Sequence, residues 1–150
     1  MNLPAAANDT MTKFAFPQSS VREYERWAVL ARPKQATLGA LVMVCKEDVQ
    51  AFSEISAEAF AEMPRVVRDI ERALKAFRPY QKINYLMLMM VDREVHSHVL
   101  PRYDAPQDFA GTTYEDPGWP ALPDLTAGPL LEGDDLETLV AALKAVWPAS

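Results

Sequence analysis

Two consecutive extended stretches, residues 82–92 and 94–100, most constrain the fold of this chain. The first is apolar on both of its alternating faces, which is typical of a central strand that is covered on both sides. The second follows after only Asp92 and Arg93, so the spacing predicts a tight antiparallel pair. We therefore expect an antiparallel sheet in which the second stretch lies near the middle.

Both histidines of the chain, His96 and His98, lie two residues apart in the second stretch. Because successive side chains of a strand point to opposite faces, the two imidazoles are expected on one face, together with Glu94 and Leu100. Imidazole has an unperturbed pKa near neutrality, so such a pair can attack, donate and accept hydrogen bonds at neutral pH. The alternative is a half-buried pair with a purely structural role.

Hydrophobic patterning predicts three further elements. Residues 27–30 and 38–45 are β-rich runs on either side of a polar turn and predict a hairpin-like pair of strands. Residues 56–77 place apolar side chains at helical spacing, which predicts an amphipathic helix capped by Ser56. Pro64 lies inside this helix and predicts either a kink or a short separate first turn.

The length of 150 residues is usual for one domain. The prolines and glycines that follow the histidine stretch suit an extended strap over the surface and not another strand. Asp134 and Glu137 form a capping-box pattern at the start of a last helix. We predict a single domain over residues 1–150, with a core at about 20–104, a proline-rich strap at about 105–133 and a C-terminal helix at about 134–147.

Charge and cysteine content limit the classes of partner and the compartment. A net charge of −6 argues against nucleic-acid binding, which normally needs a basic face, but leaves room for a small anionic ligand at a local site. The single cysteine, and residues 1–20 without a charged start and long apolar run, predict a reduced, cytoplasmic compartment. The longest apolar run, residues 85–91, is too short to span a membrane.

The run His96-Ser97-His98-Val99-Leu100-Pro101-Arg102 resembles the signature of the histidine triad family, His-x-His-x-His followed by apolar residues and often Pro-Arg. The resemblance covers roughly residues 24–103. It implies an α+β fold in which an antiparallel sheet of about five strands carries the histidines, with one main helix and a C-terminal helix. Family members commonly form homodimers, and they hydrolyse or transfer nucleotides at phosphate bonds.

The resemblance also implies roles for individual residues. His96 matches the middle histidine, which attacks the α-phosphorus of a nucleotide and forms a covalent nucleotidyl-imidazole. His98 matches the third histidine, which supports the phosphate oxygens or the leaving group. Glu94 stands where the first histidine belongs, and Asp92-Arg93 replaces the glycine-rich loop with its glutamine. Arg32 falls near the position of a ligand-binding asparagine in the dinucleotide hydrolases.

Two candidate substrate-binding residues flank the histidines, and each has a structural alternative. The carboxylate of Glu94 can orient a neighbouring histidine, repel an incoming phosphate, or be a solvated charge at a strand end. Arg102 can bind a phosphate or pair at the surface with Asp104 or Asp92.

Three more candidates lie outside the histidine stretch. Arg32 and Lys34 form either a phosphate-side loop or an ordinary exposed turn. Trp119 in the strap either stacks on a base or a partner subunit, or covers the core.

The sequence therefore predicts a nucleotide hydrolase or nucleotidyl transferase that cleaves a phosphate anhydride or phosphoramidate bond through a nucleotidyl-histidine on His96. Diadenosine tetraphosphate is the first substrate to test. No cofactor is expected to be required, although Mg²⁺ can accompany a polyphosphate substrate. The alternatives are a nucleotide-binding sensor or interaction protein with a degenerate triad and little turnover, and a metal site formed by Glu94, His96 and His98.

Overall fold

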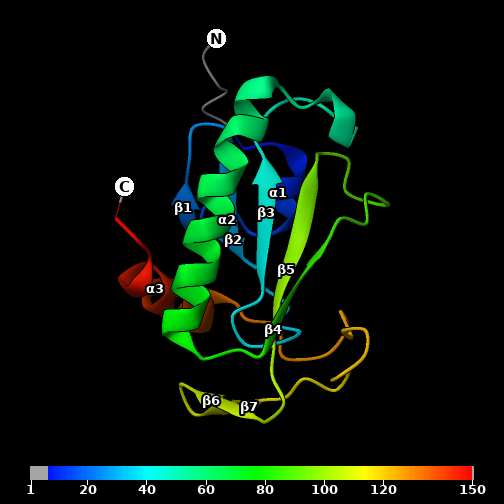
Figure 1. The fold of residues 1–150 in the computed structure, drawn as a ribbon. Coiled ribbons are helices and arrows are strands. Elements are labelled where there is room, and N and C mark those ends of the chain that lie inside the picture. The colour runs from blue at the N-terminus through cyan, green and yellow to red at the C-terminus, as the bar shows by residue number, and fades with distance from the viewer. Residues whose placement is uncertain (1–6, 150) are drawn as a thin grey trace.

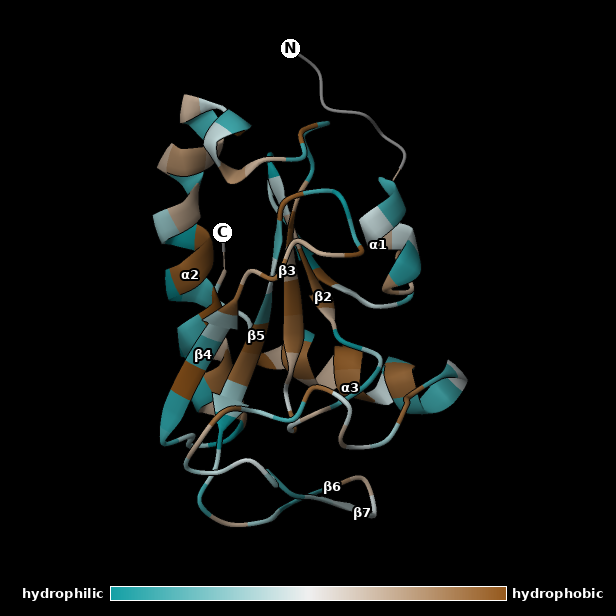
Figure 2. Cartoon of the chain, turned by 90° about the vertical axis from the view of Figure 1, so that its right-hand side faces the viewer, coloured by the Kyte–Doolittle hydropathy of each residue, from teal (hydrophilic) through white to brown (hydrophobic). Residues whose placement is uncertain are grey.

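The computed structural model describes residues 7–149 and places a central sheet between two helical layers. Helix α2 (Ala57–Phe77) crosses one face of the sheet, and the short helix α1 (Asp9–Lys13) lies on the other face (Figures 1 and 2). Helix α3 (Gly133–Val146) packs against α2 and the neighbouring edge strand. Residues 1–6 and 150 of the predicted domain lie outside the described residues.

The main sheet has five strands in the order β1-β2-β3-β5-β4, and every neighbouring pair is antiparallel. The prediction of an α+β fold with an antiparallel sheet, one main helix and a C-terminal helix is therefore confirmed. The strands are β1 (Ser20–Glu23), β2 (Trp27–Ala31), β3 (Leu41–Cys45), β4 (Lys82–Leu86) and β5 (His96–Arg102).

The tight pair predicted for residues 82–100 is wrong in two respects. Strand β4 ends at Leu86, and a long loop, not a two-residue turn, leads to β5. Strand β4 is also an edge strand, whereas β5 lies between β3 and β4. Strand β4 has apolar residues on both faces because Ile83 packs against the core beneath α2. Leu86 packs on the opposite face of the sheet, beneath the strap. Strand β4 therefore has partly buried side chains on both faces, although the strand pairs on one side only.

Helix α2 supplies the core on one face of the sheet. The side chain of Ser56 accepts a hydrogen bond from the main-chain N–H of Ala59, as a helix cap does. The helix then runs from Ala57 to Phe77 with Pro64 inside it, so a separate first turn does not form. Its buried side chains pack on the strands in a single cluster that includes Val66, Ile70, Leu74, Val29, Leu41 and Val99.

The strap and the last helix differ in detail from the prediction. The strap begins with a hairpin of β6 (Gln107–Phe109) and β7 (Thr112–Tyr114), which lies at one end of the main sheet (Figure 1). Helix α3 starts at Gly133, and Glu132 caps it without a side-chain hydrogen bond, so the predicted capping box does not form. Within residues 7–149, no helix is long and apolar enough to cross a membrane.

The opposite face of the sheet carries the histidines. In the register of the sheet, His96 lies opposite Val44, and His98 lies opposite Val42. Over β2 and β3 this face is covered by the chain's own N-terminal segment, because Met11, Phe14 and Phe16 pack there. The histidines therefore lie between α1 and the strap.

Candidate active site

His96 and His98 project side by side from β5, as the two-residue period of the strand predicts. Their ring centroids are 5.3 Å apart, and the rings are nearly perpendicular at 82°. Only 2% of His96 and 6% of His98 is exposed. Both nevertheless line a cavity of about 260 Å³. Its other lining residues are Lys13, Phe14, Arg32, Leu125 and the loop residues 88–92.

The main chain fixes the hydrogen position on His96. Its Nδ1 atom lies 2.7 Å from the main-chain oxygen of Glu94. A carbonyl oxygen can only accept a hydrogen bond, so Nδ1 carries the hydrogen and donates it. The Nε2 atom of His96 is then left with a free lone pair. A neutral imidazole in this tautomer can act as a nucleophile.

Arg32 fixes the tautomer of His98. The Nε–H of Arg32 donates to Nδ1 of His98 at 3.3 Å, so the hydrogen of a neutral His98 ring lies on Nε2. Burial, followed by the positive charges of Arg32 and of a protonated His96, lowers the pKa of His98 to about 4. At neutral pH, His98 is therefore an uncharged hydrogen-bond donor through Nε2.

Arg32 belongs to the site, but Lys34 does not. The Nη1 atom of Arg32 also donates to the main-chain oxygens of Lys34 at 2.7 Å and Leu125 at 3.2 Å, which ties the strap to the histidine cavity. Burial lowers the pKa of the Arg32 guanidinium. Lys34 instead forms a main-chain bridge with Leu130. Hydrogen bonds from Thr126, and then the charge of Lys34, lower the pKa of Asp124.

Glu94 does not have the environment of a solvated charge. It is 6% exposed, and its Oε1 atom accepts a hydrogen bond of 2.9 Å from the main-chain N–H of Thr10 in α1. Its carboxylate thus holds α1 on the sheet, while its main-chain carbonyl orients His96. Within residues 7–149, no three His, Cys, Asp or Glu side chains are placed to hold one metal ion. The alternative of a metal site at Glu94, His96 and His98 is therefore not supported.

Arg102 forms a buried ion pair with a partner that was not predicted. Its Nε and Nη2 atoms donate to the two carboxylate oxygens of Asp116 at 2.6 and 3.0 Å, and its Nη1 atom donates to Oδ1 of Asn84 at 2.7 Å. Pairing was one of the two expectations, but Asp104 and Asp92 were the wrong partners and the ion pair is buried, not at the surface. Asp116 lies in the strap, which folds back over the sheet. Asp92 pairs with Lys13 at 2.8 Å.

The N-terminal segment also contributes to the site, which the sequence patterns did not predict. The ring of Phe14 packs against His98 with its centroid at 5.6 Å, and against His96 at 6.2 Å. Lys13 joins this segment to the loop before β5 through its ion pair with Asp92. A helix of five residues is too short to show hydrophobic periodicity. The signal in the sequence is Asn8, whose side chain caps α1 by accepting from the N–H of Met11.

Comparison with known proteins identifies the fold. No model of a known protein family and no curated protein matches the chain. A histidine triad protein of Marinobacter aquaeolei VT8 is similar with a TM-score of 0.71 and 14% identity, over 98% of this chain and 97% of that chain. A histidine triad protein of Sinorhizobium meliloti 1021 matches with a TM-score of 0.69 and 18% identity, over 94% and 96% of the two chains.

A third solved structure shows the same similarity. A hypothetical histidine triad nucleotide-binding protein of Sulfolobus tokodaii strain 7 matches with a TM-score of 0.65 and 18% identity, over 91% of this chain and 88% of that chain. The chain therefore has the α+β fold of histidine triad proteins, with the five-stranded antiparallel sheet and the C-terminal helix.

Proposed function

We propose that this protein is a nucleotide hydrolase or nucleotidyl transferase that works through a covalent nucleotidyl-histidine on His96. The hydrogen bond from Nδ1 of His96 to the Glu94 carbonyl carries the proposal, because it leaves Nε2 free to attack. An uncharged His98 and the guanidinium of Arg32 lie beside it in the same cavity. The fold that the chain shares with histidine triad proteins supports the same assignment.

The reaction takes place in two displacements at phosphorus. Nε2 of His96 attacks the α-phosphorus, a nitrogen–phosphorus bond forms, and the bond from phosphorus to the leaving group breaks. The positive charge that develops on the ring is stabilised by the hydrogen bond from Nδ1 to the Glu94 carbonyl. Water, or an acceptor in a transfer reaction, then attacks the same phosphorus. The nitrogen–phosphorus bond breaks, His96 is restored, and the proton of the attacking group passes to solvent.

His98 and Arg32 support the charge of the reacting phosphate. Nε2–H of His98 donates a hydrogen bond to a phosphoryl oxygen, and Arg32 contributes positive charge beside the two buried histidines. With a pKa of about 4, His98 is not charged at neutral pH and is a poor acid. A phosphate leaving group departs as an anion without an acid, whereas an amine must be protonated. The site therefore favours a phosphate anhydride, such as diadenosine tetraphosphate, over a phosphoramidate.

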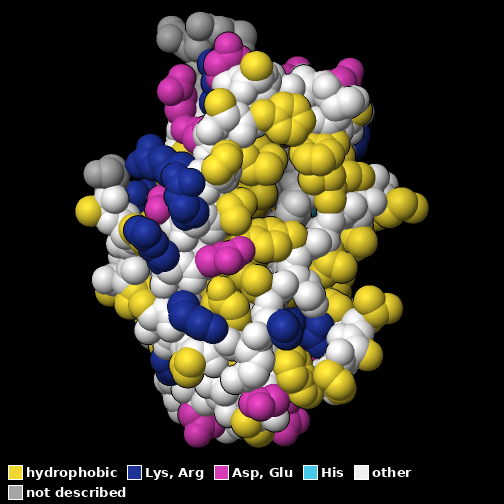
Figure 3. All heavy atoms as spheres, in the orientation of Figure 1, with side chains coloured by type: hydrophobic (Ala, Val, Ile, Leu, Met, Phe, Trp, Pro, Cys, Tyr) yellow, Lys and Arg dark blue, Asp and Glu magenta, His cyan; other side chains and the backbone are white. Residues whose placement is uncertain are grey.

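We also propose that the protein forms a homodimer in which two copies meet at the β4 edge. Among the described residues, β4 pairs with β5 on one side only. Figure 3 shows hydrophobic side chains gathered over the adjoining surface. Phe52, Phe60 and Tyr85 are 44%, 42% and 36% exposed, and such a patch beside an open strand edge is a common interface. Sedimentation of the wild type and of Tyr85→Lys tests this proposal.

A nucleotide-binding protein with little turnover is the second candidate. The observation that favours it is the position of Glu94, which stands where the family has its first histidine. Its carboxylate accepts a hydrogen bond from α1, so only His96 and His98 of these three positions line the histidine cavity. Such a protein would bind a dinucleotide tightly and release it unchanged.

Turnover and binding assays separate the two functions. Wild type and His96→Asn are incubated with diadenosine polyphosphates, with and without Mg²⁺, and products and binding are measured. Asparagine can still donate to the Glu94 carbonyl, so the variant should fold and bind while losing turnover. Turnover that persists in His96→Asn contradicts the proposed mechanism. Binding without products in the wild type supports the second candidate.

A further inference from the structure

A second and larger cavity lies beside β4 and has no part in the chemistry above. Its volume is about 730 Å³, compared with about 260 Å³ for the histidine cavity. Small-molecule sites usually measure about 300–1,000 Å³, so of these two cavities the larger one has that size. It is lined by Lys82, Ile83, Asn84, Tyr85, Leu86, Arg102 and residues 119–123 of the strap.

The register of the sheet places part of this lining on the histidine face. Leu86 of β4 lies opposite His98 of β5, and Asn84 and Lys82 follow opposite Leu100 and Arg102. Alternate residues of a strand share a face, and each step of two residues advances by about 7 Å. Asn84 and Lys82 therefore continue the face that begins at His98, one and two steps beyond Leu86.

The two cavities are adjacent. Leu86 lines the larger cavity and is paired with His98, which lines the smaller one. Leu125 lines the smaller cavity, and Pro123, two residues earlier in the strap, lines the larger. Leu86 and Leu125 both pack on Leu100 in one small cluster. A substrate with its reacting phosphorus at His96 would cross these two leucines to reach the larger cavity.

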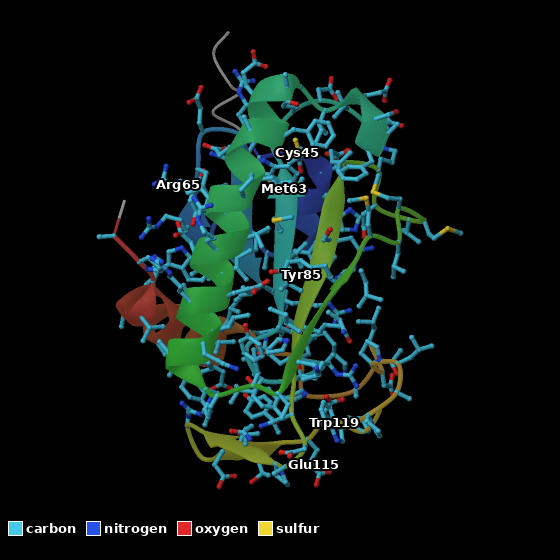
Figure 4. All side chains as sticks on the ribbon, in the orientation of Figure 1. Cys45, Met63, Arg65, Tyr85, Glu115 and Trp119 are labelled. Carbon is cyan, nitrogen blue, oxygen red and sulfur yellow. The ribbon has the colours of Figure 1, made fainter. Side chains whose placement is uncertain are left out.

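The strap contributes an aromatic wall. Trp119 lies on the strap beside the β4 edge (Figure 4) and is partly exposed. The other two tryptophans, Trp27 and Trp147, are buried at 1% and 7% exposure. Stacking on an indole is favourable for any nucleic-acid base, because every base has a π-face.

The larger cavity also carries positive charge that is free for a ligand. Lys82 is exposed and makes no ion pair within residues 7–149. The charge of Arg102, in contrast, is already neutralised by Asp116. An indole face together with an uncommitted ammonium group matches an aromatic base that is attached to phosphate.

We propose that this cavity is a subsite for the leaving group of the substrate, and that it binds a nucleoside phosphate by stacking its base on Trp119 and pairing its phosphate with Lys82. The inference rests on the proposed function, because it places the reacting phosphorus at His96. In this arrangement one nucleotide of a dinucleoside polyphosphate lies on each side of the broken bond.

Two substrates that differ only in the leaving group test the subsite. Diadenosine tetraphosphate carries a second base, whereas adenosine 5′-phosphosulfate releases sulfate, which has none. For Trp119→Ala, we expect the ratio of kcat/KM for the first substrate to that for the second to fall by about tenfold, as the loss of one base–aromatic stack predicts. Trp119→Phe should retain most of the preference, and Leu130→Ala, on the same strap outside the cavity, is the control variant.

Binding provides an independent readout. Diadenosine tetraphosphate should quench the fluorescence of wild-type protein, because Trp119 is the exposed indole, and its Kd should rise in Trp119→Ala and in Lys82→Ala. Equal losses for both substrates, or no change in Kd in either variant, overturn the subsite. If neither substrate is turned over by the wild type, the proposed function fails, and the Kd values for the dinucleotide still decide whether the subsite exists.

Discussion

Replacing Arg32 with methionine should raise the pKa of His98 by about one to two units. The pKa of His98 is lowered from its ordinary value of 6.5 to about 4, first by burial and then by the charge of Arg32. A unit charge about 5 Å from a protonated ring costs roughly 3 kcal/mol at an effective dielectric constant of about 20, which corresponds to about two pKa units before screening. Burial remains in Arg32→Met, so the new pKa should stay below 6.5.

The same pKa shift predicts how stability depends on pH. Folding favours the neutral form of His98, so the stabilisation from this group is complete above about pH 6.5 and is lost as the pH falls toward 4. A shift of this size is worth about 3 kcal/mol, which solvent screening reduces to about 2 kcal/mol. In Arg32→Met, the loss between these pH values should be smaller, because the folded and unfolded pKa values lie closer together.

NMR titration of the ring signals measures this pKa directly. The chain has only two histidines, and His96→Asn assigns the remaining signal to His98. Lys34→Met is the matched control, because it removes a charge from the same turn without touching His98 and should leave its pKa unchanged. A wild-type pKa of His98 near 6.5, or the same pKa in wild type and Arg32→Met, would refute the assigned contact and its electrostatic effect.

Three other substitutions test structural roles. Arg102→Met leaves the buried carboxylate of Asp116 without its partner and should cost about 3–5 kcal/mol in chemical unfolding; a cost below about 1 kcal/mol would match a surface pair instead. Glu94→Gln keeps an acceptor for the N–H of Thr10, so stability and turnover should remain near wild type, whereas a large loss of turnover in this variant would give the carboxylate a catalytic role. Gly128→Ala places a Cβ 1.9 Å from the main-chain oxygen of Gln35 at a φ of 83°, so hydrogen exchange in the strap should accelerate, and unchanged protection would contradict its close packing.

Sequence patterns correctly predicted those features that depend on interactions between residues close together in the sequence. The apolar spacing of residues 56–77 and the cap at Ser56 correspond to α2, because helix period and capping depend on neighbours a few residues apart. The two-residue period placed His96 and His98 on one face for the same reason. Positions that depend on distant partners were not predictable in this way.

Several of the errors involve contacts between distant segments, whereas the missing capping box of α3 is a local one. The sequence left Glu94 open between an orienting, a repelling and a solvated carboxylate, because its contact with Thr10 of α1 spans 84 residues of sequence. The partner of Arg102 becomes apparent only once the strap places Asp116 over the sheet. The apolar pattern of β4 reflects partial burial on both of its faces, but it contains no information on which strands lie beside it.

The most direct test of the central claim is the intact mass of the protein after rapid quenching with diadenosine tetraphosphate in mild base. A nucleotide-sized mass increase is expected, which tandem mass spectrometry locates on His96 and which is absent from His96→Asn. Turnover without such an adduct, or an adduct on any other residue, would contradict the assignment of His96 as the nucleophile.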